Sequence, residues 1–144
     1  MAEIEHRLGT AVKHRLRKVL ILDRDVQAKY YQLERLRSLA EKTTTTQSER
    51  VQTSSSPDKF GDIMDKIIKA EQELNDEMHA LLDATKEAKR LIDSVENDDY
   101  RHLLTMRYLC CRSWEECAVI LKCSYRHVHR LHSQALRVLG TFTS

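Results

Sequence analysis

The clearest structural signal in this sequence lies in residues 60–95, which read FGDIMDKIIKAEQELNDEMHALLDATKEAKRLIDSV. Eleven positions, spaced alternately by three and four residues, run through this stretch, and ten of them are apolar. They are Phe60, Ile63, Ile67, Ala70, Leu74, Glu77, Leu81, Ala84, Ala88, Leu91 and Val95. Glu77 is the exception, and we expect Met78 beside it to fill the gap. Such a seam predicts one long helix that packs against another helix in coiled-coil fashion.

A weaker stripe of the same kind predicts the partner helix at about residues 12–40. It consists of Val12, Leu16, Val19, Val26, Tyr30, Leu33 and Ala40, interrupted by Asp23 and Arg37. Between the two stripes, nine of the eighteen residues of the segment 41–58 are Ser or Thr, which predicts a mobile loop. Residues 1–96 should therefore form a long antiparallel helical hairpin. Two helices alone leave part of each stripe exposed, so we expect a homodimer through this hairpin.

The composition points to an all-α fold without enzymatic activity. The 144 residues include only three glycines and one proline, whereas sandwiches and barrels need many turns. We find no phosphate-binding glycine loop and no HExxH motif, and so short a chain has few elements with which to enclose a catalytic pocket. We expect neither catalytic residues nor a cofactor. The sequence lacks an apolar run long enough to span a membrane, so a cytoplasmic protein without a membrane partner is expected.

Four cysteines lie close together at Cys110, Cys111, Cys117 and Cys123. Two spacings of six residues without a CxxC pair make a poor zinc site, so no metal is expected. In a reducing compartment we expect thiols, buried in part, that serve as small apolar residues.

Charge is distributed very unevenly along the chain. Residues 58–100 contain six Lys and Arg against 13 Asp and Glu, whereas residues 101–144 contain seven against two. A basic terminal module is a candidate for binding a polyanion such as double-stranded DNA.

Residues 97–144 should form a compact module of short helices. Asn97 or Asp98 is a candidate cap for a helix whose apolar face is Tyr100, Leu103, Leu104 and Tyr108. Ser113 and Glu116 form a capping box for a second helix with Trp114, Cys117, Ala118 and Leu121 inward. Ser124 can cap a third helix with Val128, Leu131, Ala135 and Leu139 buried and Leu136 beside them. Two short helices joined by a tight turn are the helix-turn-helix pattern.

The third helix should present its basic side chains to solvent. If Val128 and Leu131 face inward, then Tyr125, Arg126, His129, Arg130 and Ser133 face outward on its first turns. In helix-turn-helix proteins these turns enter the major groove, where arginine is well suited to bidentate contact with guanine. A solvated face of a small helical bundle would carry similar residues, so the pattern alone leaves both interpretations open.

The segment YRHLLTMRYLCCRSWEECAVILKCSYRHVHRLHSQALRVL resembles the fourth region of bacterial sigma factors over roughly residues 97–140. From about residue 20, the chain also resembles a family of short phage and prophage proteins of unknown function, similar in plan to late-operon activators of the RinA and ArpU type. By position, the resemblance assigns base reading to Tyr125, Arg126 and Arg130, and phosphate contacts to Ser124, His127 and His129. Two positions depart from the sigma pattern. Cys117 replaces the core isoleucine and Lys122 replaces the turn glycine, where it can also reach a phosphate.

Three functions fit these features. The first is a sequence-specific, dimeric transcriptional regulator of a phage or prophage. The second is a DNA-packaging factor of the small-terminase kind, which would form rings. The third is a protein that binds RNA polymerase or a host factor and uses the sigma-like module as a protein surface.

Overall fold

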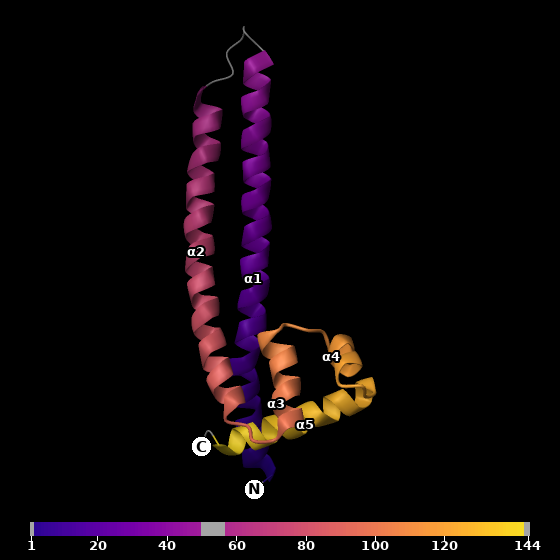
Figure 1. Ribbon diagram of the computed structural model, residues 1–144. Coiled ribbons are helices and arrows are strands. Elements are labelled where there is room, and N and C mark those ends of the chain that lie inside the picture. Colours follow the sequence, from indigo (N-terminus) through magenta and orange to yellow (C-terminus); the bar gives the residue numbers. More distant parts are fainter. Residues whose placement is uncertain (1, 50–56, 143–144) are drawn as a thin grey trace. The chain divides into compact units, whose positions relative to one another are not determined.

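The computed structural model describes residues 2–49 and 57–142, which are helical throughout apart from short links and contain no strand (Figure 1). This confirms the all-α prediction. The elements in chain order are α1 (Ala2–Glu49), α2 (Pro57–Asp93), α3 (Asp98–Leu104), the π-helix η1 (Thr105–Leu109), α4 (Trp114–Ile120) and α5 (Tyr125–Phe142).

The predicted loop at residues 41–58 is wrong at both of its ends. Helix α1 continues to Glu49 and α2 begins at Pro57, while residues 50–56 lie outside the described part of the chain. Three threonines explain the longer helix, because their hydroxyls donate to the carbonyl oxygens four residues earlier. Thr43 bonds Leu39 at 2.8 Å, and Thr44 and Thr45 bond Ala40 and Glu41 at 2.9 and 3.0 Å. These bonds satisfy the hydroxyls within the helix, so the polar segment need not leave it.

The chain divides into two compact units, and neither boundary lies at the predicted position near residue 96. One unit joins Met1–Leu22 to Leu81–Ser144, and the other comprises Asp23–Ala80. The first turns of α1 and the last turns of α2 share a core with α3 and α5. Helices α3, α4 and α5 also form a smaller core, in which Leu103, Cys117, Ala118 and Val128 are buried.

In the unit Asp23–Ala80, buried apolar residues and ion pairs link α1 to α2. Leu33 and Ile67 are buried, Lys29 pairs with Glu73 at 3.6 Å, and Arg37 pairs with Glu71 at 3.0 Å. The expectation for Met78 is wrong, because its side chain is exposed and does not fill the gap at Glu77.

The other unit has one main core, to which α1, α2, α3, η1 and α5 contribute. Its buried residues are Val12, Leu16, Val19, Ala84, Ala88, Ile92, Val95, Leu104, Tyr108, Ala135, Leu136 and Leu139. Helices α1 and α5 approach closely at two glycines. A Cβ atom on Gly140 would lie 3.1 Å from the backbone nitrogen of Gly9 and 3.1 Å from the carbonyl carbon of Leu8. A side chain at residue 140 would therefore push the two helices apart.

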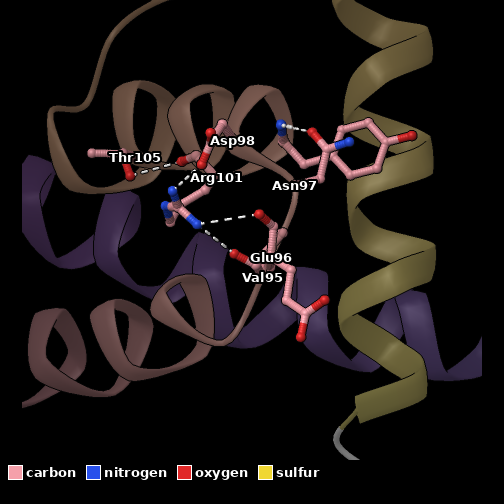
Figure 2. A network of polar contacts seen from close by, with 7 residues as sticks. Val95, Glu96, Asn97, Asp98, Arg101 and Thr105 are labelled. Carbon is pink, nitrogen blue, oxygen red and sulfur yellow. Dashed lines mark hydrogen bonds and ion pairs between the residues drawn. The ribbon is translucent and has the colours of Figure 1, made fainter.

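Arg101 fixes the link between α2 and α3 (Figure 2). Its guanidinium donates to the carbonyl oxygen of Val95 at 2.8 Å and pairs with Asp98. The backbone nitrogen of Tyr100 donates to the Asn97 side chain at 3.1 Å, so Asn97 is the cap of α3, one of the two predicted candidates. These bonds satisfy carbonyl and amide groups that the helix ends leave unpaired.

Candidate nucleic-acid interface

Helix α4 begins at the predicted capping box. The backbone nitrogen of Glu116 donates to Ser113 Oγ at 3.1 Å, and the Ser113 nitrogen donates to Glu116 Oε2 at 2.8 Å. The bond from the Ser113 nitrogen, with the positive charge of Arg112 nearby, lowers the pKa of the Glu116 carboxyl group. The inward residues of α4 are as predicted: Cys117 and Ala118 are buried, and Trp114 and Leu121 pack against the same small cluster as Leu103 and Val128.

The turn after α4 passes through Lys122 in the left-handed conformation, with φ at 54°. The Lys122 nitrogen donates to the Val119 carbonyl at 3.2 Å, and the Cys123 nitrogen donates to the Ala118 carbonyl at 3.1 Å. This pair of bonds is a Schellman motif, which usually has glycine at the left-handed position. Lysine therefore occupies the strained position that the sigma pattern gives to glycine.

Helix α5 begins after Ser124, whose Oγ accepts a bond from the backbone nitrogen of His127 at 3.1 Å. The predicted buried stripe is confirmed, because Val128, Ala135 and Leu139 have no exposed surface and Leu131 is partly buried. The opposite side of the first two turns is open to solvent. Its exposed residues are Ser124, Tyr125, Arg126, His127 and Arg130.

The two arginines on this exposed face lie four residues apart, and neither is neutralised within the structure. No ion pair among the described residues involves Arg126, Arg130 or Lys122. Side chains spaced by four residues lie on the same face of a helix. The first two turns of α5 and the preceding turn therefore present three cations, an exposed tyrosine and an exposed histidine.

The prediction that His129 faces outward is wrong. Its ring is half-buried, with its centroid 4.6 Å from that of Trp114 and 4.5 Å from that of Tyr125. Its Nε2 atom is buried without a hydrogen-bond partner among the described residues. Attraction between aromatic rings draws the imidazole against α4, an effect that helical periodicity does not report.

Sequence reasoning also missed a buried polar pair at the centre of this module. The side chain of His132 is 5% exposed, and its Nε2 lies 2.7 Å from the hydroxyl of Tyr108. Burial raises the pKa of Tyr108 to about 12. Burial, with the positive charges of Lys13, His129 and Arg107 nearby, lowers the pKa of His132 to about 4. His132 is thus neutral at neutral pH, and it shares a hydrogen bond with the tyrosine hydroxyl.

The cysteines are all free of disulfides and are buried in part, as expected. Cys117 is buried, and burial raises its pKa, whereas Cys110 and Cys111 are exposed. Within residues 2–49 and 57–142, no three His, Cys, Asp or Glu side chains are placed to hold a metal ion. In the same part of the chain, no helix is long and apolar enough to cross a membrane.

Comparison with protein families places the chain in one of them. A family described as "Protein of unknown function (DUF1492)" matches residues 41–140, and the chain belongs to that family. No curated protein and no solved structure matches the chain.

Proposed function

We propose that this protein is a sequence-specific DNA-binding transcriptional regulator of a phage or prophage, in which α4, the turn at Lys122 and α5 act as a helix-turn-helix. The observation that carries this proposal is the cationic face at the start of α5. Arg126 and Arg130 are exposed, lie on one face and have no carboxylate partner among the described residues. The resemblance to sigma region 4 supports the same interpretation.

Each exposed residue has a role in this proposal. Arg126 and Arg130 read base edges, with Tyr125 beside them on the first turn. Lys122, Ser124 and His127 contact the phosphate backbone, and Ser124 also caps α5. In such an interface, contacts to base edges determine sequence specificity, whereas contacts to the phosphate backbone position the protein and add affinity.

The α1–α2 pair serves as a helical hairpin that dimerises in this proposal. Phe60, Met64 and Ile68 are exposed and are spaced by four residues along α2, so they form an apolar stripe on its surface. A second copy of the chain would bury that stripe, and a dimer would place two copies of α5 on paired half-sites.

The test begins with selection of bound duplexes from a random pool, followed by titration of single variants against the selected and a scrambled duplex. We expect alanine at Arg126 or Arg130 to cost about 1–3 kcal/mol on the selected site and much less on the scrambled one. Alanine at Lys122 should weaken both duplexes alike and reduce the salt dependence by about one unit.

Arg90 provides the matched control, because it is an exposed arginine on α2 that lies outside the proposed interface and forms no ion pair among the described residues. Arg90→Ala should leave affinity for both duplexes unchanged. If Arg126→Ala and Arg130→Ala bind the two duplexes as the wild type does, α5 does not read DNA.

A second candidate function follows from the outer face of α4. Val119 is 77% exposed and Ile120 is 40% exposed, and Arg112, Glu115 and Glu116 border the shallow pocket that they line. An apolar patch with a charged rim is typical of a protein-binding surface. RNA polymerase or another host factor would bind there.

This alternative is tested by Val119→Glu, which should abolish binding to purified host RNA polymerase and leave affinity for DNA unchanged. Equal binding of polymerase by the wild type and the variant would remove this function for α4. A packaging factor of the small-terminase kind remains a third candidate. The number of subunits in solution distinguishes it from a dimeric regulator, because a packaging factor would form a ring.

A further inference from the structure

A basic pocket lies beside the face proposed for DNA, within the unit formed by Met1–Leu22 and Leu81–Ser144. It has a volume of about 330 Å³ and is lined by residues of α1, η1, α4 and α5. Lys13 and Arg17 come from α1, Arg107 from η1, and His129 and His132 from α5. Trp114, the single tryptophan of the chain, also lines it.

The charge of this pocket is uncompensated. No carboxylate lines it, and no ion pair among the described residues involves Lys13, Arg17 or Arg107. Three cations collected around one hollow without a counter-charge favour an anionic ligand.

Two buried nitrogen atoms at the pocket also lack partners. Arg107 uses Nη1 to donate to the Arg112 carbonyl at 2.8 Å, but its Nε has no hydrogen-bond partner in the described part of the chain. His129 Nε2 is in the same condition. Buried polar atoms in native proteins are almost always bonded, so these two nitrogens are an unusual feature of the residues that line the pocket.

The π-helix η1 places the Arg107 side chain at the pocket. The wider turn at η1 is closed by a bond of 3.0 Å from the Cys110 nitrogen to the Thr105 carbonyl. The Arg107 guanidinium carbon lies 4.5 Å from the centre of the Trp114 ring, which holds the side chain against α4. Single π turns of this kind occur frequently at functional sites.

From these contacts we infer that the pocket binds a phosphate group, held by Lys13, Arg17, Arg107 and His129. Guanidinium and ammonium groups are the side chains that proteins use for phosphate, and arginine does so through several donors at once. The volume is at the lower end of the range of small-molecule sites. A phosphorylated small molecule and a nucleic-acid backbone both carry such a group, and the inference does not require that α5 reads bases.

Fluorescence of Trp114 gives a direct test on the full-length protein without DNA. We expect inorganic phosphate to change the emission of Trp114 in a saturable manner, whereas sodium chloride at equal ionic strength should not. Lys13→Gln and Arg17→Gln should each weaken the apparent affinity for phosphate by about tenfold, because each removes one charge-assisted contact. Both residues are exposed, so neither replacement should impair folding.

Lys18→Gln is the matched control, because Lys18 is an exposed lysine of α1 that does not line the pocket. It should bind phosphate as the wild type does. A phosphate response identical to that of chloride, or equal affinities for Lys13→Gln, Arg17→Gln and Lys18→Gln, would overturn the inference.

Competition with DNA identifies the source of the phosphate group. If inorganic phosphate displaces a scrambled duplex and Lys13→Gln weakens the binding of both, the site takes a backbone phosphate. If phosphate binds and duplex affinity is unchanged, the ligand is a phosphorylated small molecule. A failure of Arg126 and Arg130 to read DNA would leave the phosphate titration intact, so the two proposals can fail separately.

Discussion

Lys122 has a strained backbone conformation, and in the proposed function its side chain contacts a phosphate. A non-glycine residue in the left-handed region costs about 1–2 kcal/mol, and Lys122 adopts φ of 54° in the turn between α4 and α5. The position remains lysine although glycine would fit the turn without strain. A contact between its ammonium group and a phosphate would account for this.

Lys122→Gly should therefore raise the free energy of unfolding while it weakens DNA binding. We expect a gain of about 0.5–1 kcal/mol, because the relief of strain exceeds the added entropy of the unfolded chain. Glu115→Gly, inside α4, should instead destabilise by about 1 kcal/mol. Urea denaturation monitored by Trp114 fluorescence measures both, and a loss of stability in Lys122→Gly would contradict the assignment of strain.

His132 should make the stability of the protein depend on pH. Its pKa in the folded protein is about 4, below the ordinary value of 6.5, so between these values the unfolded chain binds more protons. Stability is thus present above pH 6.5 and is lost as pH falls towards 4. The loss amounts to about 3 kcal/mol, since each pKa unit corresponds to about 1.4 kcal/mol.

His132→Gln, whose amide oxygen can still accept from the Tyr108 hydroxyl, isolates this effect. Urea denaturation of the wild type and the variant at several pH values between 7 and 4 gives the difference. The wild type should lose more stability on acidification than the variant. Parallel curves would show that His132 does not carry the pH dependence.

At the scale of elements, α5 and α1 approach closely at Gly140 and Gly9. Because a Cβ at residue 140 would lie 3.1 Å from backbone atoms of α1, Gly140→Leu should separate the helices and cost about 1–3 kcal/mol. Gly61→Leu is the control, since nothing lies within 4 Å of a Cβ there. Thermal unfolding followed by circular dichroism should show a lower midpoint for the first variant only. Equal midpoints would mean that the two helices are not in contact.

The helix ends show which local features a sequence reveals. The capping box of Ser113 and Glu116, the cap at Ser124 and the cap at Asn97 all form as expected, because each joins groups only three residues apart. For the threonine segment the sequence-based prediction was wrong, because composition alone was used. Its composition is typical of a loop, but the threonine hydroxyls bond carbonyls four residues earlier, and α1 continues.

At the scale of the whole molecule, the apolar stripe of Phe60, Met64 and Ile68 should set the number of subunits. We expect a dimer by sedimentation equilibrium and a monomer of unchanged helical content for Ile68→Asp, because a charge at the interface would be costly to bury. Lys66→Asp, at an exposed position on the opposite side of α2, should remain dimeric. Eight or more subunits in the wild type would favour a packaging ring, and a wild-type monomer would remove the proposed dimer.

The sequence itself determined the helical content, the apolar seam of α2 from Ile63 to Leu91, the buried stripe of α5 and the caps of the short helices. Phe60, the first residue of the predicted seam, is exposed. These features depend on residues that lie within one or two turns of each other, and the periodicity of a helix reports them directly. The basic face of Arg126 and Arg130 follows from the same periodicity.

Only the tertiary structure decided which groups from distant segments meet. The pairing of His132 with Tyr108, the ring of His129 against Trp114 and the pocket of Lys13, Arg17 and Arg107 all join residues from different helices. Their burial and charge depend on how α1, η1 and α5 pack, which no spacing along a single helix encodes. The same packing places the ends of α1 and α2 in one unit with the C-terminal helices, instead of in a separate domain.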